Sequence, residues 1–456
     1  MFMAKHTFTG GVHPFEGKDM SRDVPIKTLL PDTGEMVYPL LQHIGNPSVP
    51  VVRRGDYVRT GQLIARADRD PSANLHASVS GQVLGIDKRR TADGSLQPCI
   101  IIANDGIFLE IGYPQNRELS LLTRETVLTV VKNAGIVGMG GAGLPTHIKL
   151  RSAGEEDIDT IIANCVECEP YLTSDYRRLL ENPWKVISGL AVLLQIYPGA
   201  RGYIAVSEDN AEGYRLLREL LRDDPRIYVK RLRTKYPQGA ERQLIYALTG
   251  RTLNAKMLPR DIGCLVCNTD TLVAVNQAVI MHEPLITRIV TVTGDAAAQP
   301  GNFRVRIGMS YRQVLEQAGG LADGLKQEDA LILDGGPMTG VPIRDLDVPI
   351  TKLSSAIVCL RKEEMQRQKE TACTRCSRCL DVCPNRLMPV VLYQDARKSS
   401  TRSFIDHNGL ECCDCGCCSY ICPSKISLAA PIIAMRHALL KKPELAGDYA
   451  RRFQRE

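Results

Sequence analysis

The chain has 456 residues, of which 44% are hydrophobic and 24% are charged, and these proportions exclude global disorder. Its formal net charge of +6 is too small for this length to indicate nucleic acid binding. No run approaches the roughly 18 apolar residues of a membrane span, and no apolar segment near the start resembles a secretory signal. Sixteen cysteines in such a chain favour metal or redox chemistry over disulfides.

Residues 41–110, which follow an N-terminal segment of residues 1–40, are predicted to form a small β domain. Valine and isoleucine alternate there with polar residues, and glycines recur at the expected turns. The stretch from Gly55 to Ile64 resembles the barrel-sandwich hybrid of lipoyl and biotinyl carriers. Those carriers present a lysine at a hairpin tip, but the corresponding residues 74–78 contain none, so we expect a structural or docking role. We interpret His76 as a hairpin residue and not as a ligand.

Residues 115–285 are predicted to form an α/β layer structure, because helical and strand patterns alternate along them. Apolar residues recur at helical spacing in Thr126–Ala134 and in Ile187–Ile196, whereas Thr160–Ala163 and Gly202–Val206 read as short buried strands.

A glycine loop in this region, Gly138–Gly143, matches the pattern G-x-G-x-x-G. The segment before it reads as a helix, so the usual strand-loop-helix context of a dinucleotide fingerprint is missing. Glycines still allow the backbone to approach a phosphate or a flat ring, and Pro145 and Lys149 place a helix start and a cation nearby. We predict a phosphate-bearing ligand, with a purely structural turn as the alternative.

An acidic loop, Asn164–Tyr171, directly follows a predicted strand, which is where α/β folds place ligands. Its amide and carboxylate groups suit ring heteroatoms and ribose hydroxyls. The loop also contains Cys165 and Cys168, and a second pair follows at Cys264 and Cys267. Four such thiolates could bind zinc or a further iron–sulfur centre, although packing near the ligand is the simpler interpretation.

Residues 288–350 return to strands around one helix at Tyr311–Ala318 and are predicted to form a compact β-grasp-like unit. The unit closes with Asp334-Gly-Gly-Pro-Met-Thr339.

Ten of the cysteines lie between residues 373 and 422, in two runs with the same spacing, C-x2-C-x2-C-x3-C-P. The pattern is typical of bacterial ferredoxins with two [4Fe–4S] clusters, in which the fourth cysteine of each run ligates the other cluster. It assigns one cluster to Cys373, Cys376, Cys379 and Cys422, and the other to Cys383, Cys412, Cys415 and Cys418. A pair of zinc sites is the alternative, but zinc sites seldom use this spacing. Cys413 and Cys417 fall outside the pattern and are interpreted as packing residues.

Six motifs in one order resemble a single protein family. They are His13–Lys18, Gly140–Thr146, Asn164–Asp175, Lys235–Glu241, Asn268–Thr271 and the two ferredoxin-type runs. The order resembles the C subunit of the Rnf ion-translocating electron transport complex over nearly the whole chain. The middle part is also similar to the flavin-binding subunit of respiratory complex I.

The resemblance implies a multidomain α/β and α+β chain. Its parts would be an N-terminal segment (1–40), a barrel-sandwich hybrid (41–110), a complex-I-like FMN- and NAD-binding α/β domain (115–285), a soluble-ligand-binding β-grasp domain (288–350), a ferredoxin-like helical domain with two [4Fe–4S] clusters (361–430) and a basic tail (431–456). We interpret the tail as a solvated helix end, with a partner surface as the alternative.

The resemblance also implies an NAD(H)-dependent oxidoreductase subunit of an ion-translocating ferredoxin:NAD+ oxidoreductase. It would exchange hydride between NAD(H) and FMN and pass single electrons through the two clusters, while other subunits move the ion. The chain would be peripheral at the cytoplasmic face of the cell membrane, with membrane and ferredoxin-type subunits as partners. By motif, Gly140, Gly141, Gly143, Lys149, Asn164, Asn268 and Thr269 would line the FMN, Glu167 and Glu169 would lie at the flavin and nicotinamide, and Glu241 would lie near the nucleotide. No side chain need act as a general acid or base, so no catalytic residue is assigned.

The sequence departs from these families at two positions. Leu144 replaces the usual phenylalanine after the glycines, and Val166 stands where the complex I protein has an aspartate. Two alternatives therefore stay open: a soluble cobalamin reductase of diol-degrading microcompartments, against which the His13–Lys18 motif argues, and an electron relay that has lost nucleotide binding.

Overall fold

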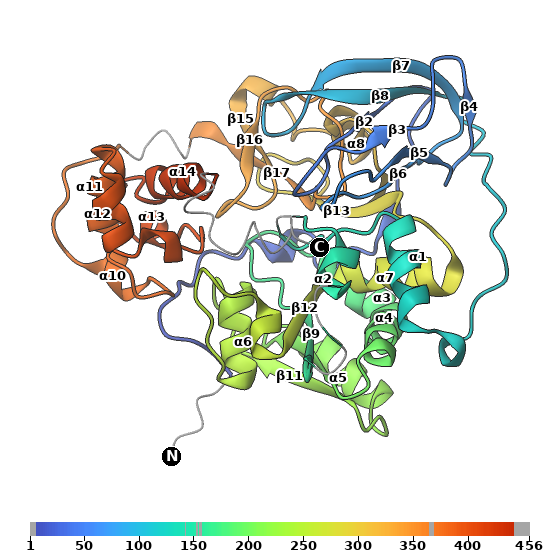
Figure 1. Ribbon diagram of the computed structural model, residues 1–456. Helices are drawn as coiled ribbons and strands as arrows, with labels where there is room; N and C mark the ends of the chain where they lie inside the picture. The colour runs from blue at the N-terminus through green and yellow to red at the C-terminus, as the bar shows by residue number, and fades with distance from the viewer. Residues whose placement is uncertain (1–5, 142, 152–153, 155–156, 364–368, 442–456) are drawn as a thin grey trace.

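The structure is a computed structural model that describes residues 6–141, 143–151, 154, 157–363 and 369–441. Three predicted features therefore lie partly outside the described residues: the glycine loop at Ala142, the ferredoxin-like domain at residues 364–368, and most of the basic tail. Figure 1 shows the α/β domain at the bottom, the β-rich domains at the upper right, and the helices that carry the cysteine runs at the left.

The barrel-sandwich domain is built from two small antiparallel sheets. Their strands, in sheet order, are β2 (Gly34–Pro39), β8 (Leu96–Asn104), β7 (Gly81–Arg90) and β4 (Tyr57–Val58), and then β3 (Val49–Pro50), β5 (Leu63–Arg66) and β6 (Leu75–His76). Met36 and Tyr38, two residues apart on β2, are both fully buried, because alternate residues of a strand face the same side. β2 pairs with β8, so this sheet includes residues before position 41.

The α/β domain contains a parallel sheet in the order β11-β10-β9-β12, and its helices cover both faces (Figure 1). Its elements are α1 (Arg124–Asn133), α2 (Thr146–Arg151), β9 (Thr160–Cys165), α3 (Ser174–Glu181), α4 (Pro183–Ile196), β10 (Arg201–Ser207), α5 (Ala211–Leu220), β11 (Ile227–Leu232), α6 (Glu241–Thr249), β12 (Cys264–Asn268) and α7 (Thr269–Met281). The predicted helices and strands of this region are confirmed.

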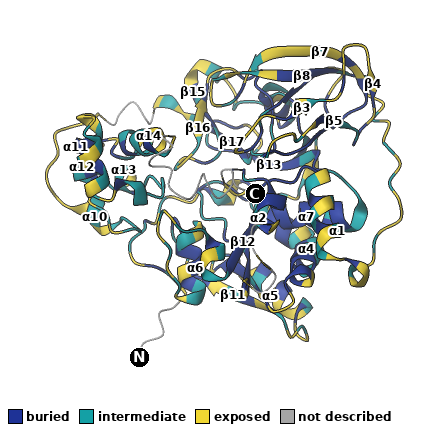
Figure 2. Ribbon diagram, viewed as in Figure 1, coloured by how far each residue is buried: buried dark blue, intermediate teal, exposed yellow. Residues whose placement is uncertain are grey.

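Alternate residues of β9 supply the two cores of this domain. Ile161 packs with α4 and α7, whereas Ile162 packs with Leu244 of α6 on the opposite face. A strand covered on both faces must be apolar on both, which explains its continuous apolar run. These strands and the helices behind them are the most continuously buried part of the chain (Figure 2).

The β-grasp domain has a six-stranded sheet against which helix α8 (Tyr311–Gln317) packs. Its strands, in sheet order, are β1 (Lys27–Thr28), β14 (Gly301–Arg306), β13 (Thr287–Thr293), β17 (Ala356–Arg361), β15 (Ala330–Asp334) and β16 (Val341–Ile343). The sheet extends beyond the predicted range 288–350 at both ends. β17, which follows residue 350, lies in the middle of the sheet, and β1 comes from the N-terminal segment.

The cysteine domain, residues 369–441, is helical and internally repeated. Its helices are α10 (Arg378–Asp381), α11 (Pro389–Arg397), α12 (Thr401–Asp406), α13 (Cys417–Tyr420) and α14 (Ala429–Leu440), with a short 3-10 helix at Gly409–Glu411. In the other domains, short 3-10 helices span Lys18–Met20, Leu119–Leu121, Pro259–Ile262 and Gln327–Asp329. Left-handed backbone conformations recur at equivalent places of the two runs: Arg375 and Asp414, Ser377 and Gly416, Arg386 and Lys425. The duplication seen in the sequence is therefore a duplication of backbone geometry. Across the described part of the chain, the helices are all too short or too polar to cross a membrane.

Candidate functional site

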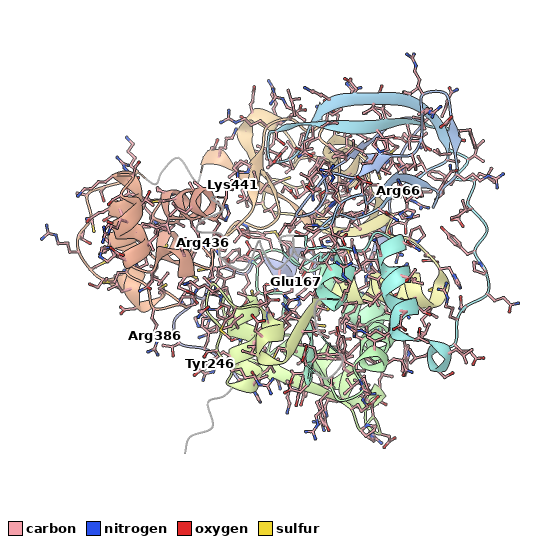
Figure 3. The ribbon with its side chains drawn as sticks, viewed as in Figure 1. Arg66, Glu167, Tyr246, Arg386, Arg436 and Lys441 are labelled. Atoms are coloured by element: carbon pink, nitrogen blue, oxygen red, sulfur yellow. The ribbon has the colours of Figure 1, made fainter. Side chains whose placement is uncertain are left out.

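A cavity of about 1370 Å³ opens at the carboxyl ends of β9 and β12, where a parallel sheet places its ligand. It exceeds the roughly 300–1,000 Å³ of a pocket for one drug-sized molecule. Its walls come from three domains: the glycine loop and the acidic loop, the loop Asp334–Gly340 of the β-grasp domain, and the loop Cys413–Gly416 of the cysteine domain. Figure 3 shows Glu167 near the middle of the molecule, while Arg386, Arg436 and Lys441 lie on the cysteine domain.

The glycine loop forms the part of the wall where backbone approaches the cavity directly. A Cβ at Gly140 would lie 2.7 Å from Cβ of Asn268, whereas one at Gly141 would meet nothing within 4 Å. Both glycines line the cavity. Gly143, at φ +78°, does not line the cavity but packs against Leu353, which does. The loop thus provides a wall without side chains, which is what a flat ring or a phosphate needs for close approach.

Asn164 and Asn268 lie at the carboxyl ends of two neighbouring strands and are paired across the sheet. Asn164 donates to the carbonyl of Gly239 at 2.8 Å, and Asn268 donates to Oδ2 of Asp175 at 2.6 Å and accepts from the backbone N–H of Asp270, capping α7. Both line the cavity. Thr269 does not line it, because this residue is fully buried and its hydroxyl donates to the carbonyl of Asn164 at 3.2 Å.

Glu167 lines the cavity but directs its carboxylate at the start of helix α3. It accepts hydrogen bonds from the backbone N–H groups of Asp175 at 3.0 Å and Tyr176 at 3.1 Å, and from the hydroxyl of Ser174. Burial raises the pKa of Glu167, and these donors oppose the increase. The side chain therefore fixes the acidic loop to the helix that follows it.

Glu169 joins the acidic loop to the β-grasp domain. Its Oε1 accepts from the backbone N–H groups of Met338 at 2.7 Å and Thr339 at 3.3 Å, and burial raises its pKa to about 7. A Cβ at Gly336 would lie 2.2 Å from Cγ of Glu169, so glycine is required there for the two loops to meet.

Lys149 and Glu241 pair with each other and do not line the cavity. Nζ of Lys149 is 3.2 Å from Oε1 of Glu241 and donates to the carbonyl of Val266 at 2.5 Å. Neither residue lines the cavity, so the structure brings six of the ten predicted ligand-binding residues to one cavity. These are Gly140, Gly141, Asn164, Glu167, Glu169 and Asn268.

A buried cluster of charged residues borders the cavity, and no sequence motif predicted it. Asp270 accepts from Nε of Arg178 at 2.9 Å and from Nη1 of Arg288 at 2.8 Å, and Arg288 lines the cavity. Burial would raise the pKa of Asp270, but the two guanidinium groups hold it below its ordinary value. The pKa of the nearby Asp175 shifts in the opposite direction. Burial, together with the negative charge of Glu167, raises it well above the ordinary value. Asp175 belongs to the Asn164–Asp175 motif, but Arg288 lies on β13 of another domain, so no local pattern could indicate it.

The last cysteine of the first run lies beside the cysteines of the second run. A small cavity is lined by Cys383 of the first run together with cysteines of the second run. These are the assigned ligands Cys412, Cys415 and Cys418 and the two residues outside the pattern, Cys413 and Cys417. Burial, followed by the thiolates of Cys412 and Cys383, raises the pKa of Cys418 to about 12. Each thiolate of a [4Fe–4S] cluster binds a different iron, so its ligands need not converge on one point. Thiol donors around a small apolar cavity fit such a cluster.

The second cysteine set does not form a site. Cys165 and Cys267 pack in the core on one face of the sheet, whereas Cys264 packs in the core on the other. Among the described residues, no three His, Cys, Asp or Glu side chains converge as the ligands of a single metal ion would. Cys165, Cys264 and Cys267 are packing residues, whereas Cys168 lines the large cavity and its Sγ accepts from the backbone N–H of Gly239 at 3.2 Å. Cys417 is also fully buried, as interpreted, in an apolar cluster with Val12 and Tyr236.

Three family models match this chain in the order of its domains. They are the RnfC barrel sandwich hybrid domain over residues 6–107, the Nuo51 FMN-binding domain over 131–277 and the SLBB domain over 289–342.

Three relatives are similar over most of the chain, and each is named as the C subunit of its complex. That of the proton-translocating ferredoxin:NAD(+) oxidoreductase complex of Clostridium ljungdahlii is 39% identical, covering 86% of this chain and 86% of that protein. That of the Na(+)-translocating ferredoxin:NAD(+) oxidoreductase complex of Acetobacterium woodii is 35% identical, covering 89% of this chain and 91% of that protein. That of the ion-translocating oxidoreductase complex of Haemophilus influenzae is 36% identical, covering 86% of this chain and 59% of that protein.

Proposed function

The chain belongs to the RnfC family, the C subunits of the ion-translocating ferredoxin:NAD+ oxidoreductase complexes, and on that premise we propose how its residues carry out electron transfer. It is an oxidoreductase subunit with an FMN-binding domain, and its cofactors are FMN and two [4Fe–4S] clusters, with NAD(H) as substrate. One observation carries the proposal: a single cavity is lined by the glycine loop, the acidic loop and a loop of the cysteine domain.

We assign the ring and phosphate of FMN to the wall formed by Gly140, Gly141, Asn164 and Asn268. The wall has backbone without side chains at the glycines and amide groups at the two asparagines, which suits a flat heteroaromatic ring. When bound, flavin converts the hydride of a nicotinamide into single electrons. Glu167 and Glu169 hold the loop in place through backbone N–H groups, and the volume beyond them leaves room for the nicotinamide.

The two cysteine sets have different positions relative to this cavity. Cys415 lines it, whereas Cys373 and Cys376 are exposed at the surface. We propose that the set Cys383, Cys412, Cys415 and Cys418 exchanges electrons with the cavity side. The set Cys373, Cys376, Cys379 and Cys422 would then exchange electrons with the partner subunits. Cys422 is the crossed ligand here, and the neighbouring Cys376 and Cys422 thiolates add to the effect of burial in raising the pKa of Cys379.

We further propose membrane and ferredoxin-type subunits of the complex as partners, and a peripheral position at the cytoplasmic face of the membrane. Relatives named as subunits of such complexes support this assignment. The alternative of a soluble cobalamin reductase is not favoured by any of these relatives. Co-purification with membrane subunits would separate the two.

The test is anaerobic reconstitution of the full chain with FMN, iron and sulfide, followed by titration with NADH. We expect the flavin absorbance to bleach and EPR signals of reduced [4Fe–4S] clusters to follow. Bleaching without cluster signals would contradict the electron path. Cluster signals with dithionite but no bleaching with NADH would indicate a relay without nucleotide binding.

A further inference from the structure

Residues 6–20, here called the N-terminal strap, run between the cysteine domain and the α/β domain. On the cysteine side, the backbone N–H of Gly11 donates to the carbonyl of Val382 at 2.8 Å, and Arg386 donates to the hydroxyl of Thr9 at 3.3 Å. A Cβ at Gly10 would lie 2.9 Å from the carbonyl oxygen of Cys383, which the ferredoxin pattern assigns as a cluster ligand. The strap therefore contacts the backbone that carries one of these thiols.

On the other side, the strap pairs with the segment that borders the cavity. Val12 and Tyr236 exchange two backbone hydrogen bonds, at 2.8 and 2.9 Å, as in an antiparallel bridge. The ammonium group of Lys235 donates to the carbonyl of Gly10 at 2.9 Å and to that of Phe8, and lies 3.9 Å from the centre of the Phe8 ring. Tyr236 itself lines the cavity.

Further along, the strap holds the acidic loop. The carbonyl of Glu16 accepts from the backbone N–H of Tyr171 at 2.6 Å, and the ammonium group of Lys18 donates to the carbonyl of Glu167. A Cβ at Gly17, where φ is +59°, would lie 2.4 Å from the Tyr171 ring.

The strap also supplies the centre of a buried apolar cluster between the domains. Val12 is 4% exposed and packs with Tyr236 and the fully buried Cys417. Partly buried members come from the acidic loop, the β-grasp loop and the cysteine domain: Cys168, Met338, Val382, Cys415 and Ile421. The strap thus shares one apolar cluster with the loops of all three domains that form the cavity.

We propose that the N-terminal strap is a positioning segment: it holds the cysteine domain against the cavity and so sets how fast electrons pass from the cavity to the thiol-bound clusters. This inference rests on the proposed function. The cysteine domain has a second attachment, because Arg242 of α6 donates to Glu411 at 2.8 Å and Gln243 donates to Asn385 at 2.8 Å. Displacing the strap should therefore shift the cysteine domain without detaching it.

The test compares Gly11→Ala with Gly94→Ala in the full reconstituted chain. Both glycines have nearly the same left-handed backbone, at φ +82° and +81°, so the conformational cost of the new Cβ is matched. At Gly11 the Cβ would lie 2.6 Å from the carbonyl oxygen of Tyr236, whereas at Gly94, in the β7–β8 hairpin, it meets nothing within 4 Å.

Three measurements separate positioning from folding: the rate of flavin bleaching by NADH, the rate of cluster reduction by NADH, and the EPR signal after dithionite. In Gly11→Ala we expect unchanged bleaching and dithionite signals, and cluster reduction at least about tenfold slower than in Gly94→Ala, because misplacement of reacting groups is costly. Hydrogen exchange at the Tyr236 amide should also be faster. Equal cluster reduction in the two variants would overturn the inference.

A second pair of variants decides the matter if Gly11→Ala fails to retain its clusters. Lys235→Met removes the ammonium group that holds Phe8 and Gly10, and Lys230→Met is its control, since the Lys230 ammonium group lies away from the strap, 6.0 Å from the centre of the Tyr203 ring. If only Lys235→Met slows cluster reduction by NADH, the positioning role of the strap is supported. Equal rates of cluster reduction in the two variants would overturn it. If the parent chain shows no NADH-driven cluster reduction, the proposed function fails; faster exchange at Tyr236 in Gly11→Ala would then still report the strap contact.

Discussion

Gly140 shows how a single residue shapes the candidate flavin wall. Its backbone lies against the Asn268 side chain so closely that a Cβ would be 2.7 Å from Cβ of Asn268. Gly138, two residues earlier, has only ordinary contacts, with its nearest neighbour, the carbonyl oxygen of Leu144, at 3.6 Å. Glycine at 140 is therefore required by packing, whereas glycine at 138 is not.

We expect Gly140→Ala to weaken FMN binding at least about tenfold, a loss of about 1.4 kcal/mol, because Asn268 must move away from the wall. Gly138→Ala is the matched control and should stay within about threefold of the parent. Fluorescence titration of the flavin-free protein with FMN measures both. Equal affinities in the two variants would show that Gly140 does not form part of the flavin wall.

At the scale of elements, the cysteine runs are repeated loops that each start a short helix. α10 follows Ser377 and α13 follows Gly416, both in the left-handed conformation, so the backbone enters its helix in the same way in each run. The pairing of Cys383 with the second run follows from packing one repeat against the other. The sequence pattern predicted this crossing only because the spacing is typical of ferredoxins.

Cys415→Ala and Cys417→Ala test this arrangement, because the residues are two positions apart and only the first is an assigned ligand. We expect Cys415→Ala to lose one cluster, lowering bound iron from about eight to about four per chain, as Cys383→Ala should also do. Cys417→Ala should retain about eight, since Cys417 packs in the apolar cluster of the strap. Iron analysis and EPR of the reconstituted proteins measure the outcome. Equal iron loss in both variants would contradict the ligand assignment.

At the scale of the whole molecule, three domains meet at Lys352. This residue is fully buried, and its ammonium group donates to the carbonyl of Asn74 in the barrel-sandwich domain at 2.5 Å and to that of Gly135 in the α/β domain at 2.6 Å. Burial lowers its pKa to about 7. His43 lies in the same junction, where its Nε2 accepts from the backbone N–H of Ala73 at 3.1 Å. Burial, with a further contribution from the positive charge of Lys352, lowers the pKa of His43 to about 4.

This junction should make the chain sensitive to acid. Between pH 6.5 and 4 the unfolded chain protonates His43 while the folded chain does not, so the free energy of unfolding falls as the pH falls. The loss is about 1.4 kcal/mol per pH unit, or up to about 3 kcal/mol. His43→Gln keeps a hydrogen-bond acceptor but cannot take up the proton, so its thermal unfolding midpoint should fall less than that of the parent between pH 7 and 5. His13→Gln, at an exposed position, is the control and should follow the parent. Parallel declines of the parent and His43→Gln would contradict the prediction.

The sequence by itself determined the local chemistry of this protein. Thiol spacing, glycine positions and alternating apolar residues are properties of neighbouring residues, so the two cysteine runs, the acidic loop, two strands of the α/β sheet and the β-grasp helix could be predicted. The family resemblance grouped Gly140, Gly141, Asn164 and Asn268, and the structure brings them to one cavity because the ends of adjacent parallel strands meet at one edge of a sheet.

Only the tertiary structure decided which of these residues face one another. Lys149 and Glu241 pair with each other and do not line the cavity, Thr269 turns away from it, and Arg288 arrives from another domain, because side-chain direction depends on packing between distant segments. Composition suggested that the sixteen cysteines serve metal or redox chemistry, and spacing selected eight of them. Burial on opposite faces of the sheet then showed that Cys165, Cys264 and Cys267 are core residues. The strap also depends on tertiary structure, since its contacts join residues that are 149 to 377 positions apart.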